Sequence, residues 1–269
     1  MFIMSSRLVS VSMEFPIVLQ DVSVRYRLPK ERIRSVKEFV IKSFRGRIEY
    51  EEFWALKNIT FQVPPGEILG IIGRNGAGKS TLLKLIARVM KPIYGTIRVP
   101  GKVAPMIELG GGFDHELSGR ENVYLFGSIL GINRREMDKK FAAIVEFAEL
   151  EDFIEAPLRA YSSGMIMRLA FAVVIAVDPE IMILDEIMAV GDTAFQEKCQ
   201  AHIARFRQAG GTILFVSHSL DQILKFCDRA LWLEHGEMRE WGNTESVVHQ
   251  YANYLESMVS RQITLPEQI

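Results

Sequence analysis

Cysteine is scarce in this sequence. The two cysteines, Cys199 and Cys227, do not have the spacing of a metal-ligand pair, which excludes a zinc site built from cysteine pairs. We therefore expect both thiols to be reduced and packed in the core of a cytosolic protein.

Long hydrophobic runs are also absent. The longest, from Leu169 to Val177, is far shorter than the ~20 residues that a membrane-spanning helix needs. Near the N-terminus, Glu14 and Gln20 interrupt the apolar residues and no small-residue cleavage site follows, unlike in a signal peptide. Any membrane role is therefore expected from the cytosolic face.

Neither sign of charge is in excess, because 32 Lys and Arg face 33 Asp and Glu. Without a global positive field, the composition does not favour nucleic acid as a partner. The apolar fraction of 48% and the charged fraction of 24% are those of an ordinary soluble protein. A chain of 269 residues suits one large domain or two small ones.

Apolar runs alternate with helical patterns along the chain, which favours a mostly parallel sheet with helices packed on it. Buried strands are expected at 67–73, 181–185 and 212–217, and a helix at 81–90 follows the first. Residues 117–177 are mostly helical in pattern, and a hairpin is expected around His235 and Gly236. Residues 244–258 have the apolar spacing of a closing helix.

A glycine-rich stretch after the first expected strand fits the pattern G-x-x-x-x-G-K-[ST]. Its residues, all candidates for nucleotide binding, are Gly73, Arg74, Asn75, Gly76, Ala77, Gly78, Lys79, Ser80 and Thr81. The glycines allow successive backbone N–H groups to point at phosphate oxygens. Lys79 adds a positive charge for the outer phosphates, and the Ser80 hydroxyl is a hard oxygen ligand suited to Mg²⁺.

Two acids and a histidine follow the later strands. Asp185 is placed to hold Mg²⁺, and Glu186 to orient and deprotonate a water that attacks the γ-phosphate. His218 is a candidate contact to the same phosphate. Because ligands bind at this edge of an open α/β sheet, we expect Glu186 and His218 to be catalytic.

A second helix start also has the chemistry of an anion site. Ser162, Ser163 and Gly164 stand just ahead of an apolar helical run, and free N–H groups at a helix N-terminus attract negative charge. A serine there is also an ordinary helix cap. The residues by themselves allow both roles.

In their order along the chain, these motifs resemble those of ABC ATPases. They are the phosphate loop at 73–81, the signature segment Tyr-Ser-Ser-Gly-Met at 161–165, the acid pair at 185–186, Ala-Val-Gly-Asp at 189–192, and His218. The resemblance covers nearly the whole chain. It implies an α/β P-loop NTPase with a RecA-like parallel-sheet core, an antiparallel β subdomain and a helical subdomain at about 117–177.

The resemblance also implies a homodimer that closes head to tail on two ATP molecules with Mg²⁺. Ser162, Ser163 and Gly164 of one subunit would then contact the ATP held by the other. Asp192 would lie in the D-loop of that family. Because the chain carries one set of motifs, a complete site needs a second chain.

Departures from the usual motifs narrow the resemblance. The signature segment reads Tyr-Ser-Ser-Gly-Met instead of the usual Leu-Ser-Gly-Gly-Gln. After the acid pair, the chain continues Ile187-Met-Ala-Val-Gly-Asp192 instead of a run that begins Pro-Thr-Ser. A glutamine loop is expected upstream, and Glu108 stands in its place. Together they look like the ATP-binding subunits of bacterial polysaccharide exporters for O-antigen, capsule or teichoic acid. This implies a peripheral ATPase on the cytoplasmic face of the inner membrane, driving an integral-membrane permease. We expect one domain at 1–258, a short tail at 259–269 and no carbohydrate-binding domain.

An insert at 30–52 is strongly basic. Between Lys30 and Arg47 it holds seven basic residues and two acids, with apolar side chains on one helical face. This predicts a basic amphipathic helix that contacts the membrane surface, the permease or the pyrophosphate of a lipid-linked substrate. A solvated surface helix is the plainer alternative.

Adenine binding requires an aromatic platform. Tyr26 and Trp54 are both candidates, and we prefer Trp54 because it directly precedes Ala55 and Leu56, where many relatives place an aromatic residue. Alternative functions are a soluble ABC ATPase of translation or DNA repair, a subunit of another transporter, and a small-molecule kinase. The single phosphate loop, the lack of sustained heptads and the signature variant argue against them.

Overall fold

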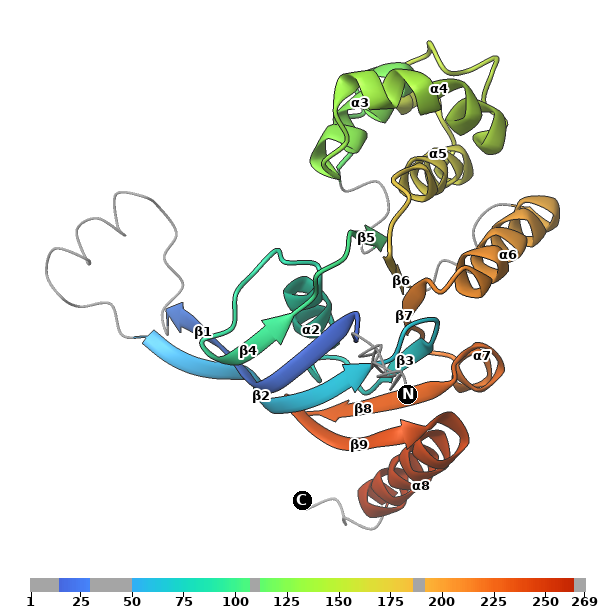
Figure 1. The fold of residues 1–269 in the computed structure, drawn as a ribbon. Helices are drawn as coiled ribbons and strands as arrows, with labels where there is room; N and C mark the ends of the chain where they lie inside the picture. The colour runs from blue at the N-terminus through green and yellow to red at the C-terminus, as the bar shows by residue number, and fades with distance from the viewer. Residues whose placement is uncertain (1–14, 30–49, 107–111, 186–191, 264–269) are drawn as a thin grey trace, which may run out of the picture.

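A computed structural model gives the fold and describes residues 15–29, 50–106, 112–185 and 192–263. The strands are β1 (Ile17–Pro29), β2 (Tyr50–Val63), β3 (Ile68–Ile72), β4 (Tyr94–Arg98), β5 (Val103–Met106), β6 (Ile181–Asp185), β7 (Thr212–Val216), β8 (Arg229–Glu234) and β9 (Glu237–Asn243). The helices are α2 (Lys79–Ile86), α3 (Gly119–Ile129), α4 (Arg134–Ala148), α5 (Ser163–Ala176), α6 (Thr193–Gln208), α7 (Leu220–Phe226) and α8 (Thr244–Ile263), with a 3-10 turn at Leu158–Ala160. In Figure 1, α3, α4 and α5 form a separate group above the strands.

The core is a six-stranded sheet in the order β5-β6-β7-β3-β8-β9. Its strands run parallel except β9, which pairs antiparallel with β8. Strands β3 and β7 are buried along their whole length, as expected for continuous apolar strands covered on both faces. The predicted α/β class is confirmed, and the strands expected at 67–73, 181–185 and 212–217 differ from β3, β6 and β7 by at most one residue at either end.

A second sheet, antiparallel, has the order β2-β1-β4. Its strands β1 and β2 form a long hairpin that pairs Ile17 with Val63 at one end and Pro29 with Tyr50 at the other. Residues 50–52 therefore belong to β2, which corrects the predicted limits of the insert. The connection at 30–49, including the predicted basic helix, lies outside the described residues.

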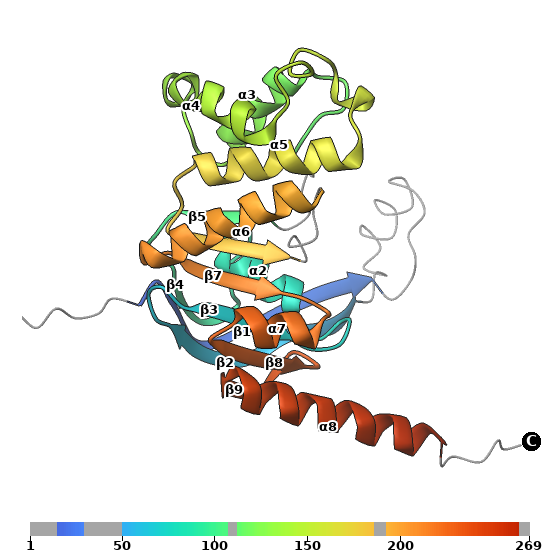
Figure 2. The same ribbon diagram turned by 90° about the vertical axis from the view of Figure 1, so that its right-hand side faces the viewer.

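The helical subdomain predicted at about 117–177 is present as α3, α4 and α5 (Figures 1 and 2). Helix α3 begins with a capping box, in which Ser118 and Glu121 each accept a hydrogen bond from the backbone of the other. The fully buried Asn122 then donates to the carbonyl oxygens of Asp114 and Leu117. These bonds fix the path by which the chain enters the subdomain.

Two predicted helices have different ends in the structure. Helix α2 starts at Lys79 and ends at Ile86, so the range 81–90 was wrong at both ends; Arg88 adopts a left-handed φ of 60° and stops the helix. Helix α8 continues to Ile263, past the expected limit of 258. The predicted hairpin is confirmed, because His235 and Gly236 have φ values of 50° and 78°, as a type I′ turn requires.

Cys199 and Cys227 are both free and buried, as predicted, and burial raises the pKa of each thiol to about 12. Within the described ranges, we find no helix whose length and apolar character would carry it through a membrane.

Candidate nucleotide site

The phosphate loop joins the end of β3 to the start of α2. Gly73, Gly76 and Gly78 have φ angles of 146°, 79° and 108°, which glycine adopts without the steric cost of a Cβ. Two of them also lack space for a side chain. A Cβ on Gly73 would lie 2.2 Å from the carbonyl oxygen of Leu233, and one on Gly78 would lie 2.6 Å from that of Ala55. The loop is therefore shaped by close backbone contact with β8 and β2.

The N-terminus of α2 differs from those of the five helices that follow it. Side chains cap α3, α4, α5, α6 and α7, whereas Gly78 at the N-cap of α2 offers no side-chain hydrogen bond. The first N–H groups of α2 therefore point their partial positive charge at the loop, where an anion can accept from them. Lys79 Nζ donates to the carbonyl oxygens of Gly73 and Arg74 at 2.6 and 3.1 Å, which keeps its charge within the loop.

Three strand ends meet beside this loop. Ile71 of β3 pairs with Val216 of β7, and Val216 pairs with Asp185 of β6. Because parallel strands share one carboxyl edge, the backbone of Asp185, the phosphate loop and His218 after β7 are brought together. This is the arrangement that the sequence predicts, although Glu186 itself lies outside the described residues.

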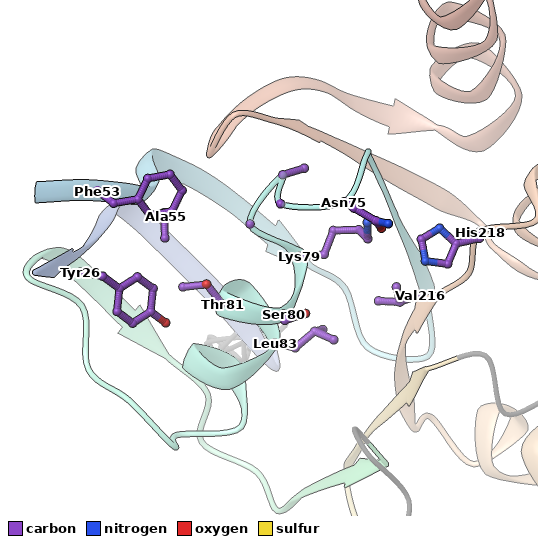
Figure 3. A pocket seen from close by; sticks show the side chains of 13 residues that line it. Tyr26, Phe53, Ala55, Asn75, Lys79, Ser80, Thr81, Leu83, Val216 and His218 are labelled. Carbon is purple, nitrogen blue, oxygen red and sulfur yellow. The ribbon is translucent and has the colours of Figure 1, made fainter. Parts of the chain in front are cut away.

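A cavity of about 270 Å³ opens at this edge. It is lined by Tyr26, Phe53, Ala55, Asn75, Gly76, Ala77, Gly78, Lys79, Ser80, Thr81, Leu83, Val216 and His218. Figure 3 shows the Tyr26 and Phe53 rings at one end and His218 at the other, with the phosphate loop and the start of α2 between them. An aromatic end and a phosphate end suit a nucleotide lying along the loop.

Two predicted residues of the phosphate loop do not line this cavity. Gly73 packs against the backbone of Leu233, and the guanidinium of Arg74 lies 3.6 Å from the sulfur of Met258 on α8. The side chain of Arg74 therefore extends toward the C-terminal helix, and any contact of this residue with a phosphate would be made by its backbone.

The preference for Trp54 as the adenine platform is not supported. Tyr26 and Phe53 are cross-strand partners and line the cavity, whereas Trp54 is paired with Arg25 on the opposite face of β2. There the Trp54 ring stacks on Tyr94 at 6.1 Å, with the Arg25 guanidinium 5.4 Å from its centroid. Adjacent residues of a strand face opposite sides, so Phe53, which the sequence analysis missed, lines the cavity together with the predicted candidate Tyr26, and Trp54 does not.

The signature segment starts α5. Ser162 is the N-cap and accepts a hydrogen bond from the backbone N–H of Met165 at 3.2 Å, which confirms the helix-cap role. Tyr161 is buried and donates its hydroxyl to the carbonyl of Phe153, and burial raises its pKa. Ser162, Ser163 and Gly164 do not line the cavity of their own chain.

The fold of its own chain does not require Gly164 to be a glycine. Its φ lies outside the left-handed region, and a Cβ placed on it would meet only Ser162 Oγ, at 3.8 Å. The loop glycines Gly73 and Gly78 lack this freedom. Within its own chain, Gly164 therefore has room for a methyl group.

Asp192 caps α6, accepting from Phe195 N–H at 2.9 Å through one carboxylate oxygen and pairing with Arg168 through the other. The N–H of Phe195 and the charge of Arg168 lower the pKa of Asp192, so the carboxylate stays ionised. Glu108, which the sequence analysis expects at the glutamine-loop position, lies outside the described residues.

Comparison with known proteins gives the family. Residues 56–189 match the family model described as ABC transporter. The O-antigen export system ATP-binding protein RfbB of Klebsiella pneumoniae is 44% identical over 241 residues, covering 89% of this chain and 98% of the relative. The teichoic acids export ATP-binding protein TagH of Bacillus anthracis is 38% identical over 243 residues, which is 90% of this chain and 43% of TagH.

Among solved structures, the dimeric post-hydrolysis state of the ATP-binding cassette MJ0796, bound to ADP and Pi, has a TM-score of 0.66 at 22% identity. The alignment covers 85% of this chain and 98% of that one, and it supports the fold. With the family match, the identity to RfbB along nearly its whole length and the phosphate loop in place, the chain belongs to the ABC transporter family as an ATP-hydrolysing subunit.

Proposed function

We propose that this ATPase works as a homodimer and powers a membrane permease that exports a lipid-linked polysaccharide of the O-antigen, capsule or teichoic acid type. The observation that carries the proposal is the 44% identity to an O-antigen export ATP-binding protein over 98% of its length. The relative named for teichoic acid export agrees in substrate class. Both names describe an ATP-binding protein of an export system.

The homodimer is supported by the distribution of anion-binding groups within one chain. The phosphate loop and His218 line one cavity, whereas the exposed Ser162 and Ser163 begin a helix that does not reach it. A second copy, presenting Ser162 and Gly164 to the terminal phosphate, would complete it.

In the proposed reaction, a water attacks the γ-phosphorus and the bond to the bridging oxygen of ADP breaks, which releases phosphate. Glu186 would orient this water and take its proton, and His218 would contact the γ-phosphate. Ser80 and Asp185 offer the hard oxygen donors that Mg²⁺ prefers, and Ser80 lines the cavity beside the loop. Bound Mg²⁺ supplies neutralisation of charge on the phosphate oxygens.

ATP would favour the closed dimer, because only in that form does it contact both the phosphate loop of one chain and Ser162 and Gly164 of the other. Hydrolysis would remove the γ-phosphate that joins these two sets of groups. The closing and opening of the dimer would drive a permease in the inner membrane, which the ATPase would contact from the cytoplasmic face. Glu108 at the glutamine-loop position and the basic segment at 30–49 are the proposed contacts with the permease and with anionic groups at the membrane.

The dimer is tested by measuring ATPase rate per molecule during dilution. We expect the specific rate to fall as the protein is diluted, because two chains form each site. Lys79→Ala should abolish ATP binding in calorimetry, and Glu186→Gln should trap an ATP-dependent dimer while cutting turnover by about 10²–10⁴-fold. A parent rate that is unchanged by dilution, or a Glu186→Gln rate within about twofold of the parent, would contradict the proposal.

The export function is tested in cells that lack the gene. Surface polysaccharide should disappear, lipid-linked polymer should accumulate inside, and the parent gene but not Glu186→Gln should restore export. Co-purification of the tagged ATPase with a multispanning permease gives the partner. Normal surface polysaccharide in the deleted strain would refute this substrate while leaving the ATPase assignment intact.

A further inference from the structure

Helix α8 packs on the core sheet through aromatic residues. Trp232 of β8 meets Tyr251 and Tyr254 of α8, with ring centroids 5.4 and 5.0 Å apart. Trp232 and Tyr251 are buried. Both ribbon views show α8 beside β8 and β9 (Figures 1 and 2). The helix is therefore fixed to the strand whose end contacts the phosphate loop.

The turn that follows β8 is bonded directly to the phosphate loop. The N–H of Gly236 donates to the carbonyl oxygen of Ala77 at 3.0 Å, and the carbonyl oxygen of Gly236 accepts from the N–H of Lys57 at 2.7 Å. The carbonyl of Leu233 is the atom that leaves no room for a Cβ on Gly73. A side chain at the end of β8 is thus well placed to position the loop.

Glu234, the last residue of β8, is a carboxylate buried at this turn. It is 2% exposed, and its Oε1 lies 3.3 Å from Nε2 of His235. Its other oxygen, Oε2, has no hydrogen-bond partner among the residues that the structure describes. A buried acceptor without a donor loses hydration and gains nothing in exchange, so it calls for an explanation. This position favours a cationic donor that can reach Oε2.

Arg74 of the phosphate loop is a cation close to the same place. Its guanidinium lies 3.6 Å from the sulfur of Met258, a weak acceptor, and within the described ranges it pairs with no carboxylate. Burial raises the pKa of Tyr251, the charge of Glu234 raises it further, and the charge of Arg74 lowers it. Arg74 and Glu234 therefore both lie close to one phenol.

Lys79 connects the position of Arg74 to phosphate binding. Its Nζ donates to the carbonyl oxygens of Gly73 and Arg74, and the carbonyl of Arg74 also accepts from the N–H of Ala77 at 3.1 Å. Phosphate oxygens are stronger acceptors for an ammonium group than neutral carbonyls are. A phosphate in the loop therefore draws Lys79 away from one of the two bonds that hold this peptide group, which lets the Arg74 side chain turn.

We infer that Arg74 is a positioning residue of the phosphate loop, and that its guanidinium pairs with Oε2 of Glu234 when nucleotide phosphates occupy the loop. The pair holds the loop against the β8–β9 turn in its phosphate-binding form. Arg74 acts through the loop backbone and touches no reacting atom. The inference requires nucleotide binding by a single chain, so it depends neither on the proposed homodimer nor on the exported polymer.

The test compares the full-length parent with Arg74→Met, Glu234→Gln and the double variant, using ADP affinity in calorimetry and ATPase kinetics. Met keeps the apolar stem of Arg74, and Gln keeps the shape of Glu234 without its charge. We expect each single variant to weaken ADP affinity about tenfold and to raise the KM for ATP with it. The kcat should stay within about twofold, because the pair stabilises bound substrate and transition state equally. The double variant should lose no more than the larger single loss, because both changes remove the same pair.

Glu237→Gln is the matched control. Glu237 is the cross-strand partner of Glu234 in the same hairpin, but its carboxylate pairs with Lys57 at 3.2 Å. Its ADP affinity should remain within about twofold of the parent. Arg74→Lys should recover part of the affinity lost in Arg74→Met, because it keeps the charge but not the planar fork.

Trp232 gives a spectroscopic reading of the movement. The chain has three tryptophans, so Trp54→Phe and Trp241→Phe leave Trp232 as the one fluorophore of this type. Adding ADP should change its emission, because the guanidinium arrives next to the indole packed beside Glu234 and Tyr251. The same background with Glu234→Gln should lose most of that change.

Several results would overturn the inference. Parent-like ADP affinity in Glu234→Gln would mean that water satisfies the buried carboxylate. Losses that multiply in the double variant, or an equal loss in Glu237→Gln, would show a general effect on the hairpin. Trp232 emission that does not respond to ADP would reject the movement of Arg74. A parent ATPase rate that is independent of dilution would remove the homodimer and leave each of these expectations unchanged.

Discussion

Replacing Gly164 with alanine is expected to stabilise the protein while reducing its activity. Gly164 is the second residue of α5, has no left-handed φ and leaves a Cβ 3.8 Å from its nearest neighbour, Ser162 Oγ. Such a Gly→Ala change reduces the entropy of the unfolded chain and adds up to about 1 kcal/mol of stability. For a domain of this size that corresponds to a rise in melting temperature of about 2–4 °C.

The expected loss of activity follows from the space that Gly164, without a side chain, leaves at the start of α5. In the proposed homodimer, the terminal phosphate of the partner's ATP approaches the backbone at the start of α5. A Cβ extends about 1.5 Å into that approach, and a misplacement of about 1 Å can cost on the order of 10²-fold in rate. We therefore expect kcat to fall at least about tenfold, with ATP binding to the isolated subunit unchanged because Gly164 does not line its own cavity.

The assay combines thermal unfolding without nucleotide and ATPase rate at saturating ATP. Ser128→Ala, on an exposed position of α3 in the same subdomain, is the control: it favours the helix by a few tenths of a kcal/mol and should leave the rate unchanged. A Gly164→Ala protein that is more stable and fully active would refute the reasoning, since the glycine would then serve neither its own chain nor a partner. A fall in stability would show instead that the helix start is packed more tightly than the structure indicates.

Three further outcomes are expected. Phe53→Ala should weaken ATP binding about tenfold by calorimetry, whereas Trp54→Ala, on the opposite face of β2, should change it less than about twofold; the reverse order would restore Trp54 as the adenine platform. Burial lowers the pKa of His202 below its ordinary value of 6.5, so between these two values the unfolded chain binds more protons and stability falls as pH is lowered through that window. Urea midpoints measured at about pH 7.5 and about pH 5.5 should show this fall, and His202→Gln should reduce it. Phe171→Ala removes the ring between α4 and α6 and should cost about 3–5 kcal/mol in urea unfolding; a loss under about 1 kcal/mol would mean that the contacts of this ring with Phe147 and Phe195 do not hold the subdomain.

Local chemistry in the sequence determined the phosphate loop and the strands around it. Glycines at 73, 76 and 78 followed by Lys79 specify a loop whose backbone faces inward, because all three have φ values that favour glycine and the sites at 73 and 78 also leave no room for a Cβ. Continuous apolar runs such as β3 and β7 identify buried parallel strands without any knowledge of their neighbours. Cap residues such as Ser118 and Ser162 mark helix starts for the same local reason.

Register and long-range contact were decided by the tertiary structure. The sequence offers Phe53 and Trp54 side by side, and only the pairing of β2 with Tyr26 on β1 shows which of them faces the nucleotide cavity. Likewise, Arg168, Glu149 and Asp192 are far apart in the chain, so their meeting depends on α5 packing against α6. A strand's period tells which residues share a face, but the side toward which that face turns is fixed by the partners it packs against.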